Sequence, residues 1–129
     1  PFLGICVGMQ VLFEQGLEMG NHQGLGVLPG QVVRFEIDAA LKVPHTGRNQ
    51  IEPRQSVYIL RDLPVNSWAY FNHGYICQAS PEHILATADY GGPFACVVGK
   101  DNVLGIQFHP EKSQHIGLHI MRNFVSGGR

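Results

Sequence analysis

The sequence lacks an excess of charge, a run of basic residues and an apolar stretch of membrane-spanning length. Nine Lys and Arg residues stand against ten Asp and Glu residues, which gives a formal net charge of −1. Because nucleic acids and anionic membranes attract basic surfaces, we expect neither among the partners of this protein. The apolar runs are broken by Gly, Pro or polar residues well before the ~20 positions that a transmembrane helix requires.

Cysteine is also scarce, and its spacing argues against a disulfide framework. Cys6, Cys77 and Cys96 form an odd set without paired spacing, which is typical of reduced thiols in the cytoplasm. The remaining composition is that of a globular protein, with 129 residues that are 44% hydrophobic and 15% charged. This length predicts a single domain over residues 1–129. The chain starts without Met inside a predicted strand, so we expect it to be the C-terminal portion of a longer domain.

Apolar periodicity predicts a mixed α/β domain with a helix near each end. A buried strand over residues 2–5 leads into a helix over residues 7–15, which Gly16 ends. Pro29-Gly30 predicts a hairpin or a bend between strands, and the composition of residues 46–49 predicts a loop. The other predicted elements are a short helix or turn near 60–66, strands near 68–71, 83–90, 93–101 and 102–109, and a closing helix capped by Ser113. The apolar stripe of that helix comprises Ile116, Ile120, Met121, Phe124 and Val125.

Cys6 lies at the centre of Gly4-Ile5-Cys6-Val7-Gly8, between the first predicted strand and the first predicted helix. Small residues two positions before and after are typical of a nucleophile elbow, a turn so tight that neighbouring backbones pass closely. A cysteine in such a turn caps a helix N-terminus, where the helix dipole favours the thiolate. The Val7 N–H would point into the same space and help to stabilise an oxyanion. The alternative is a buried packing cysteine, which we expect for Cys77 and Cys96.

A candidate base for this nucleophile lies in the stretch GIQFHPEKS. His109 and Glu111 flank Pro110 in strand-like sequence, so the two-residue period would place both side chains on one face. A carboxylate behind an imidazole selects its tautomer and stabilises the imidazolium, which completes a set of nucleophile, base and orienting group. An isolated His-Pro-Glu more often lies at an ordinary surface. Together with the elbow, it predicts a catalytic triad of Cys6, His109 and Glu111.

The other histidines carry weaker predictions. His115 and His119 stand four positions apart on the closing helix, a spacing that suits a metal, but no third ligand accompanies them and we expect no metal site. His73 lies in a predicted loop, where it could contact substrate. The histidines at loops or strand ends without an obvious partner are His22, His45 and His83.

These segments together resemble a known family, the class I or triad glutamine amidotransferases. In chain order, the similarity rests on GICVGMQ, GLGVLPGQVVRF, KVPHTGRNQI, YFNHGY and QFHPEKS, and it runs from Pro1 to Phe124. The elbow and the His-Pro-Glu motif belong to the whole class. The segments GLGVLPGQVVRF and VPHTGRN, with the Lys-Ser after His-Pro-Glu, are more specific and resemble the glutaminase subunit family of imidazole glycerol phosphate synthase.

The resemblance implies a flavodoxin-like sheet with flanking helices that lacks its N-terminal strands. It also implies glutaminase chemistry without a cofactor. Cys6 would attack the side-chain amide of glutamine and form a glutamyl thioester, with His109 as general base and acid and Glu111 as its orienting group. The residues that would bind the substrate beside Val7 are Gln10, Gly74 and Tyr75.

The resemblance further implies a heterodimer with a (β/α)8-barrel cyclase subunit. That partner would receive the ammonia and make imidazole glycerol phosphate in histidine biosynthesis. The implied partner interface and ammonia exit comprise Arg48, Asn49, Tyr70 and Lys112, although the family usually carries Trp at the position of Arg48. Two alternatives stay open: a paralogous class I subunit that supplies another ammonia acceptor, and a non-catalytic interaction module or inactive fragment.

Overall fold

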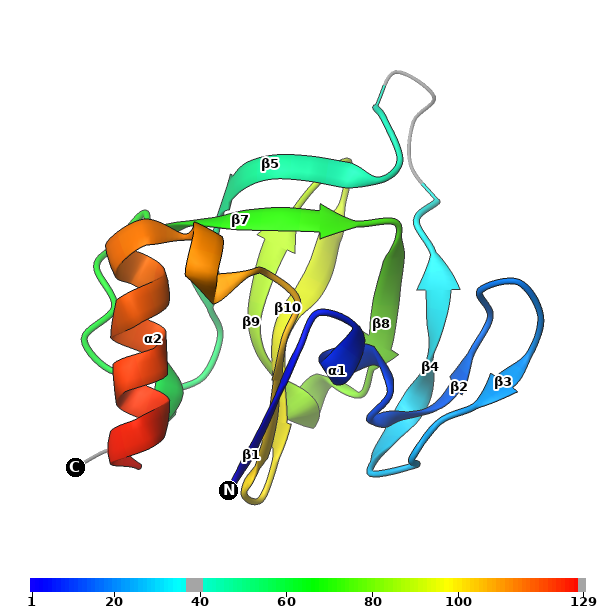
Figure 1. Ribbon diagram of the computed structural model, residues 1–129, viewed down its shortest axis with the longest axis horizontal. Helices are drawn as coiled ribbons and strands as arrows, with labels where there is room; N and C mark the ends of the chain where they lie inside the picture. Colours follow the sequence, from blue (N-terminus) through cyan, green and yellow to red (C-terminus); the bar gives the residue numbers. More distant parts are fainter. Residues whose placement is uncertain (37–40, 128–129) are drawn as a thin grey trace.

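The computed structural model describes residues 1–36 and 41–127, and this part of the chain forms three β-sheets and one long helix (Figure 1). The central sheet has five strands in the order β1-β11-β10-β9-β6. These strands are β1 (Phe2–Ile5), β6 (Glu52–Pro53), β9 (Ile84–Asp89), β10 (Pro93–Lys100) and β11 (Val103–Ile106). Strands β1 and β11 are parallel, whereas β10 pairs antiparallel with β11 and β9, and β6 antiparallel with β9.

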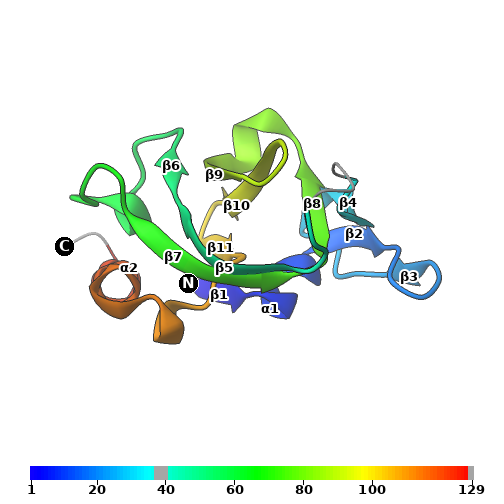
Figure 2. The ribbon, with the colours of Figure 1, turned by 90° about the horizontal axis from the view of Figure 1, so that it is seen from above.

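A second sheet and a two-stranded ribbon complete the β structure. The second sheet, in the order β3-β2-β4-β8, contains β2 (Phe13–Gly16), β3 (His22–Gln23), β4 (Leu28–Arg34) and β8 (Tyr75–Ala79). The ribbon pairs β5 (His45–Gln50) with β7 (Trp68–His73) in antiparallel register. It lies above β1 and α1, and its strand β7 leads into β8, as the two views of Figures 1 and 2 show.

Helices are few in the described residues. The two α-helices are α1 (Val7–Gln10) and α2 (Gln114–Ser126), and the 3-10 turns are η1 (Tyr58–Leu60), η2 (Pro81–His83) and η3 (Pro110–Lys112). Helix α2 stands beside η3 at one edge of the molecule (Figure 1). Within residues 1–36 and 41–127, no helix is long and apolar enough to span a membrane.

The core consists of two apolar clusters that meet across β10. Phe94, Cys96 and Val97 belong to the larger cluster, and Ala95 and Val98 belong to the smaller one. Strict alternation would send Cys96 and Val97 to opposite faces, but the pairing of β10 with β9 shifts register between Ala95 and Val97. A β-bulge of this kind inserts one extra residue, so two neighbours face the same side. The continuous apolar sequence of β10 therefore fills both cores.

Most of the predicted long elements are confirmed. Strands β1, β7, β9, β10 and β11 and helix α2 all form, and the mixed α/β class is correct. We expected helices that flank the sheet, and the α-helices of the described residues are α2 and the four-residue α1. Ser113 is the N-cap of α2, but its hydroxyl donates to the His109 carbonyl at 2.6 Å. Val125, predicted in the apolar stripe, is 80% exposed.

The helix predicted over residues 7–15 is wrong beyond Gln10. Helix α1 ends there, and Phe13 begins β2, which pairs in parallel with β4 and antiparallel with β3. Phe13 is fully buried and lies opposite Leu28 in this pairing. Extended pairing with the next two strands of the chain thus overrides a local apolar pattern that suits a helix equally well.

Of the two alternatives predicted at Pro29-Gly30, the hairpin is wrong, because β4 continues through both residues, whereas the irregular pairing of β4 with β2 at this point supports a bend. Gly30 has φ of 122°, and a Cβ atom there would lie 2.1 Å from the Gln78 carbonyl oxygen. Glycine is therefore required for β8 to approach β4 this closely. Pro29 lies where the pairing of β4 with β2 is irregular, a position at which its missing N–H is tolerated.

The loop predicted over residues 46–49 is a strand instead. Strand β5 pairs with β7 without interruption, from His45 opposite His73 to Gln50 opposite Trp68. Pro44 and Gly47 made this segment look irregular, but the cross-strand partner is distant in sequence and could not be seen locally. His73, predicted in a loop, consequently lies in β7 and is 5% exposed.

The inner face of the ribbon encloses two histidines among aromatic rings. His45 is 3% exposed and His73 is 5% exposed. The rings within about 6 Å include Phe35, Phe94 and Tyr90. Burial disfavours the imidazolium and lowers the pKa of each histidine to about 4. Both histidines are therefore neutral in the folded protein at neutral pH.

We predict that acid weakens the fold through these two histidines. Their folded pKa values of about 4 lie below the unfolded value of 6.5, so the unfolded chain binds more protons between these limits. The free energy of unfolding should therefore fall as pH drops through this window, by up to about 1.4 kcal/mol per pH unit for each histidine. His45→Phe, which keeps an aromatic ring, should flatten this dependence in urea denaturation. Parallel curves for the variant and the parent protein would contradict the prediction.

Candidate active site

The backbone at Cys6 makes a strained turn between β1 and α1. Cys6 has φ of 56° and ψ of −108°, a conformation that a residue with a side chain rarely adopts. Its N–H donates to the Ile106 carbonyl at 2.8 Å, and the N–H groups of Met9 and Gln10 donate to its carbonyl. The strand, turn and helix predicted around this cysteine are therefore present, although the helix is short.

The two glycines of the elbow differ in their roles. A Cβ atom on Gly4 would lie 2.2 Å from the Gly8 carbonyl oxygen, so only glycine fits there. A Cβ atom on Gly8 would meet no heavy atom of the described residues within 4 Å. The expectation that close packing requires both glycines is thus supported for Gly4 alone.

The environment of the Cys6 sulfur raises the pKa of the thiol, contrary to the thiolate expected from a helix dipole. The largest cause is burial, which disfavours the charged form, and the negative charge of Glu111 adds to it. Hydrogen bonds from the Val7 N–H and the Gln107 side chain act in the opposite direction but do not prevail. Helix α1 has only four residues, so it supplies little of a helix dipole.

Gln107 is a further residue of this site, and no sequence motif pointed to it. Its side chain is fully buried, donates from Nε2 to the Cys6 Sγ at 3.8 Å, and accepts from Gln10 Nε2 at 3.5 Å. A buried amide needs partners, and these two contacts supply them. The sequence feature that could have indicated Gln107 is its position as a lone polar residue in the apolar stretch before His109.

His109 and Glu111 lie together, but at the start of a 3-10 turn rather than along a strand. Turn η3 begins directly after His109, and the His109 Nδ1 lies 3.3 Å from the Glu111 Oε1. The His109 N–H donates to the Tyr70 carbonyl at 2.9 Å, which ties this segment to β7. The predicted alternation of a strand is therefore wrong, although the predicted pair forms through the turn.

Parallel pairing of β1 with β11 brings these segments to the same edge of the sheet. Ile5 lies opposite Ile106, Cys6 follows β1 immediately, and His109 follows β11 after a further two residues. Among the described residues, the Cys6 Sγ takes a side-chain hydrogen bond from Gln107 and none from His109. The charge of Glu111 nevertheless acts on the thiol of Cys6.

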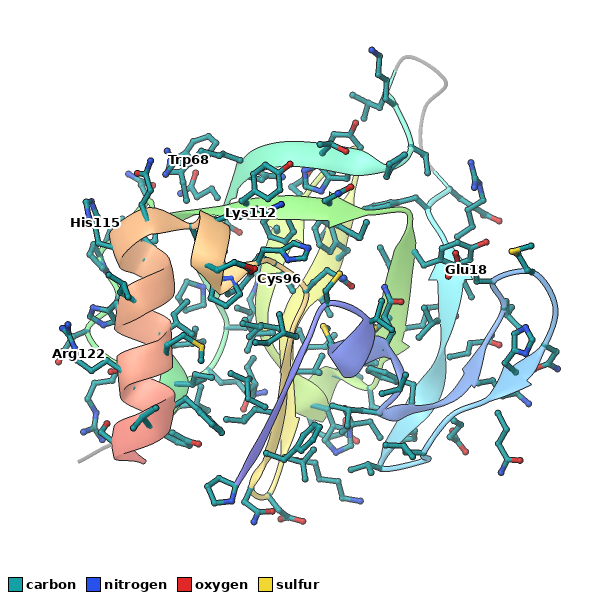
Figure 3. The ribbon with its side chains drawn as sticks, viewed as in Figure 1. Glu18, Trp68, Cys96, Lys112, His115 and Arg122 are labelled. Carbon is teal, nitrogen blue, oxygen red and sulfur yellow. The ribbon has the colours of Figure 1, made fainter. Side chains whose placement is uncertain are left out.

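The predicted substrate residues fall into two places. Val7 and Gln10 line a cavity of about 380 Å³, whose wall also includes His22 of β3 and Glu18 from the segment between β2 and β3. This volume is in the range of small-molecule sites. Gly74 and Tyr75 do not line it: Gly74 connects β7 to β8, and Tyr75 is the first residue of β8. Figure 3 shows Glu18 on the side of the molecule away from Lys112.

Three of the four predicted interface residues share one face of the ribbon. Arg48 lies opposite Tyr70 in the pairing of β5 with β7, and the Lys112 Nζ lies 5.4 Å from the centre of the Tyr70 ring. In Figure 3, Lys112 of η3 lies beside the ribbon strand β7, which begins at Trp68. Asn49 points the other way, since its Nδ2 donates to the Asp89 carbonyl at 2.7 Å.

No group of three or more His, Cys, Asp or Glu residues in the described part of the chain is placed to hold a metal ion. His119 instead approaches the Arg61 carbonyl with its Nε2 at 2.6 Å. Cys77 and Cys96 are buried, as expected, and burial raises the pKa of the Cys77 thiol to about 12. Cys6 is thus the most accessible of the three thiols.

Comparison with known proteins identifies the family. The model of the glutamine amidotransferase class-I family matches residues 1–127. The chain belongs to the class-I glutamine amidotransferases. The resemblance predicted from its motifs is therefore confirmed.

The relatives of this class-I glutamine amidotransferase include imidazole glycerol phosphate synthase subunits HisH. That of Desulfitobacterium hafniense (strain DSM 10664 / DCB-2) is 51% identical over 125 residues, which cover 96% of this chain and 58% of the relative. That of Salinibacter ruber is 51% identical over 132 residues, covering 98% of this chain and 61% of the relative. The chain thus spans about three fifths of the length of these relatives.

Among solved structures, a glutamine amidotransferase from Thermotoga maritima matches this class-I amidotransferase with a TM-score of 0.60. The match covers 98% of this chain and 46% of that protein, at 21% sequence identity. At this identity, the likeness concerns the fold alone. It agrees with the α/β class predicted from the sequence.

Alanine substitutions at the two elbow glycines of the amidotransferase should differ in their effect on the free energy of unfolding. Gly4→Ala would press a methyl group into the Gly8 carbonyl, so we predict a loss of at least about 2 kcal/mol in the free energy of unfolding. At Gly8, which lies in α1, an added methyl group meets free space. The free energy of unfolding of Gly8→Ala should therefore stay within about 1 kcal/mol of that of the parent protein. Urea denaturation of both variants tests the contrast, and equal losses would refute it.

The ionisation of Cys6 should respond in opposite directions to changes at two neighbours. Glu111→Gln removes a negative charge and should lower the pKa of the thiol, whereas Gln107→Met removes a hydrogen-bond donor and should raise it. The measurement is the pH dependence of iodoacetamide alkylation, whose rate follows the thiolate fraction.

Cys6→Ser gives the background of this alkylation assay, which should be low because Cys77 and Cys96 are buried. At neutral pH, Glu111→Gln should react faster than the parent protein and Gln107→Met more slowly. A shift of both variants in the same direction would contradict the electrostatic description of the site.

Proposed function

We propose that this chain carries the glutaminase active site of an imidazole glycerol phosphate synthase, with Cys6 as nucleophile, His109 as general base and acid, and Glu111 as orienting carboxylate. The observation that carries the proposal is the strained backbone of Cys6 at the same sheet edge as the His109–Glu111 pair. Strain of this kind is found where a side chain must be presented to a substrate. The names of the HisH relatives support the assignment.

The proposed reaction begins with proton transfer, because the raised pKa of Cys6 keeps the thiol protonated at neutral pH. The Nδ1 of His109 faces Glu111, which leaves the Nε2 to accept the thiol proton. The sulfur then attacks the side-chain carbonyl carbon of glutamine. In this scheme the Val7 N–H, which hydrogen-bonds the sulfur, donates to the developing oxyanion.

Collapse of the tetrahedral intermediate breaks the carbon–nitrogen bond. His109 returns its proton to the departing nitrogen, ammonia leaves, and a glutamyl thioester remains on Cys6. A water molecule then loses a proton to His109 and attacks the thioester, which releases glutamate and restores the thiol. In this scheme Gln10 and the Gly74-Tyr75 backbone hold the substrate.

We further propose that the ammonia acceptor is a (β/α)8-barrel cyclase, bound as a heterodimer in the cytoplasm during histidine biosynthesis. The outer face of the ribbon supports this, since it presents two cations, Arg48 and Lys112, on either side of Tyr70. Asn49 faces inward and would act behind this surface. A subunit that serves another ammonia acceptor is the second candidate, because the match to the family model is specific for the class only.

A diazo-ketone analogue of glutamine provides the test of the nucleophile. The analogue should alkylate Cys6 alone, as read by peptide mass spectrometry, because the substrate site must present it to the sulfur. Cys77→Ala is the matched control and should label like the parent protein. Cys6→Ala should abolish labelling and reduce glutaminase turnover by at least about 10³-fold.

Labelling that persists in Cys6→Ala would refute the proposed nucleophile.

Addition of the barrel cyclase with its nucleotide ligand distinguishes the histidine-pathway subunit from a subunit that serves another ammonia acceptor. Stimulation of glutaminase turnover is expected for the histidine pathway. Its absence would favour a subunit that serves another ammonia acceptor.

A further inference from the structure

The two buried histidines connect the ribbon to the proposed substrate backbone. The His45 Nδ1 lies 3.1 Å from the His73 Nε2, and the His73 Nδ1 lies 3.0 Å from the Tyr75 carbonyl oxygen. At the other end, the Asn49 Nδ2 lies 3.5 Å from the His45 Nε2. The three side chains and the Tyr75 carbonyl therefore form a continuous hydrogen-bonded line from β5 to the start of β8.

The Tyr75 carbonyl determines the direction of this line. A carbonyl oxygen only accepts, so the His73 Nδ1 carries the proton. Because burial keeps this histidine neutral, its Nε2 has no proton and must accept from the His45 Nδ1. The same argument leaves the His45 Nε2 as an acceptor for Asn49. Each tautomer is thus set by the next group along the chain.

Aromatic packing holds the His45 ring in this orientation. Tyr90 stacks on one face with ring centres 4.0 Å apart, and Phe71 stacks at 5.1 Å. Tyr90 is itself held, because its hydroxyl donates to the Lys42 carbonyl at 2.7 Å. The ring cannot turn without breaking these stacks, so the hydrogen-bond chain has little freedom.

The peptide unit between Gly74 and Tyr75 is held from a second side. Its carbonyl oxygen, on Gly74, accepts from the Phe35 N–H at 3.0 Å. In a trans peptide the N–H points opposite to the C=O, so the Tyr75 N–H points away from Phe35. The contact from His73 fixes the next carbonyl, on Tyr75. Together these contacts leave one orientation for the backbone that we assign to substrate binding.

We propose that Asn49, His45 and His73 form a directional hydrogen-bond chain that positions the Gly74-Tyr75 backbone for glutamine. The proposal rests on the proposed function, in which this backbone binds the substrate. The three side chains are positioning residues and touch no reacting atom. Because Asn49 lies next to Arg48 on β5, the chain also links the partner-facing ribbon to the substrate site.

The first experiment reads the tautomers directly in the 129-residue chain. Long-range nitrogen–proton NMR correlations distinguish Nδ1–H from Nε2–H in each imidazole. We expect both His45 and His73 to be neutral at neutral pH with the proton on Nδ1. A proton on Nε2 of either ring, or an imidazolium signal, would overturn the proposal whether or not the protein is a glutaminase.

The second experiment compares His73→Leu with His73→Asn in the glutaminase assay with the cyclase present. Asparagine keeps a donor near the position of Nδ1, whereas leucine keeps only the bulk. His73→Leu should raise KM for glutamine about tenfold, the effect of one lost hydrogen bond, with kcat within about twofold of the parent. His73→Asn should recover most of the affinity.

A matched change at the other ring, His45→Phe, keeps the aromatic stack and should also raise KM. Equal KM values for His73→Leu and His73→Asn would overturn the proposal, as would a fall in kcat without a change in KM. Failure of the analogue to label Cys6 in the parent protein would refute the proposed function instead. The NMR tautomers would then still decide whether the hydrogen-bond chain exists.

Discussion

The parallel pairing of β1 with β11 is the interaction on which the candidate site depends. It places Ile5 opposite Ile106 and continues into the elbow through the hydrogen bond from the Cys6 N–H to the Ile106 carbonyl. Two glycines make this geometry possible. Gly4 lets the backbone of α1 fold back over β1, and Gly105 leaves room for Met9, whose Cγ would lie 2.8 Å from an added Cβ atom.

The placement of the thiol has a chemical consequence. The same packing that holds the elbow withdraws the Cys6 sulfur from water, and this raises the pKa of the thiol. A protonated thiol is a poor nucleophile, so turnover depends on transfer of its proton to a base. The pair of His109 and Glu111 takes this role in the proposed reaction. In the proposed reaction, activity is therefore controlled by proton transfer rather than by a preformed thiolate.

Sequence patterns predicted those parts of the fold whose signals are local. The apolar runs of β9, β10 and β11 and the stripe of α2 were recognised because burial on one or both faces leaves a clear period. Residues 11–15 and 46–49 were assigned wrongly, since strands β2 and β5 form through pairing with other segments of the chain. The positions of Cys6, His109 and Glu111 were recognised from motifs, whereas Gln107 and the partner of His45 were not.

By itself, the sequence determined the family and the residues proposed for the chemistry, because the elbow and the His-Pro-Glu motif are short patterns whose chemistry is local. Only the tertiary structure decided how these residues behave. The direction of the Cys6 pKa and the neutral state of His45 and His73 follow from burial by strands far away in the chain. Desolvation and cross-strand hydrogen bonds depend on which groups surround a side chain, and that is a property of the assembled fold.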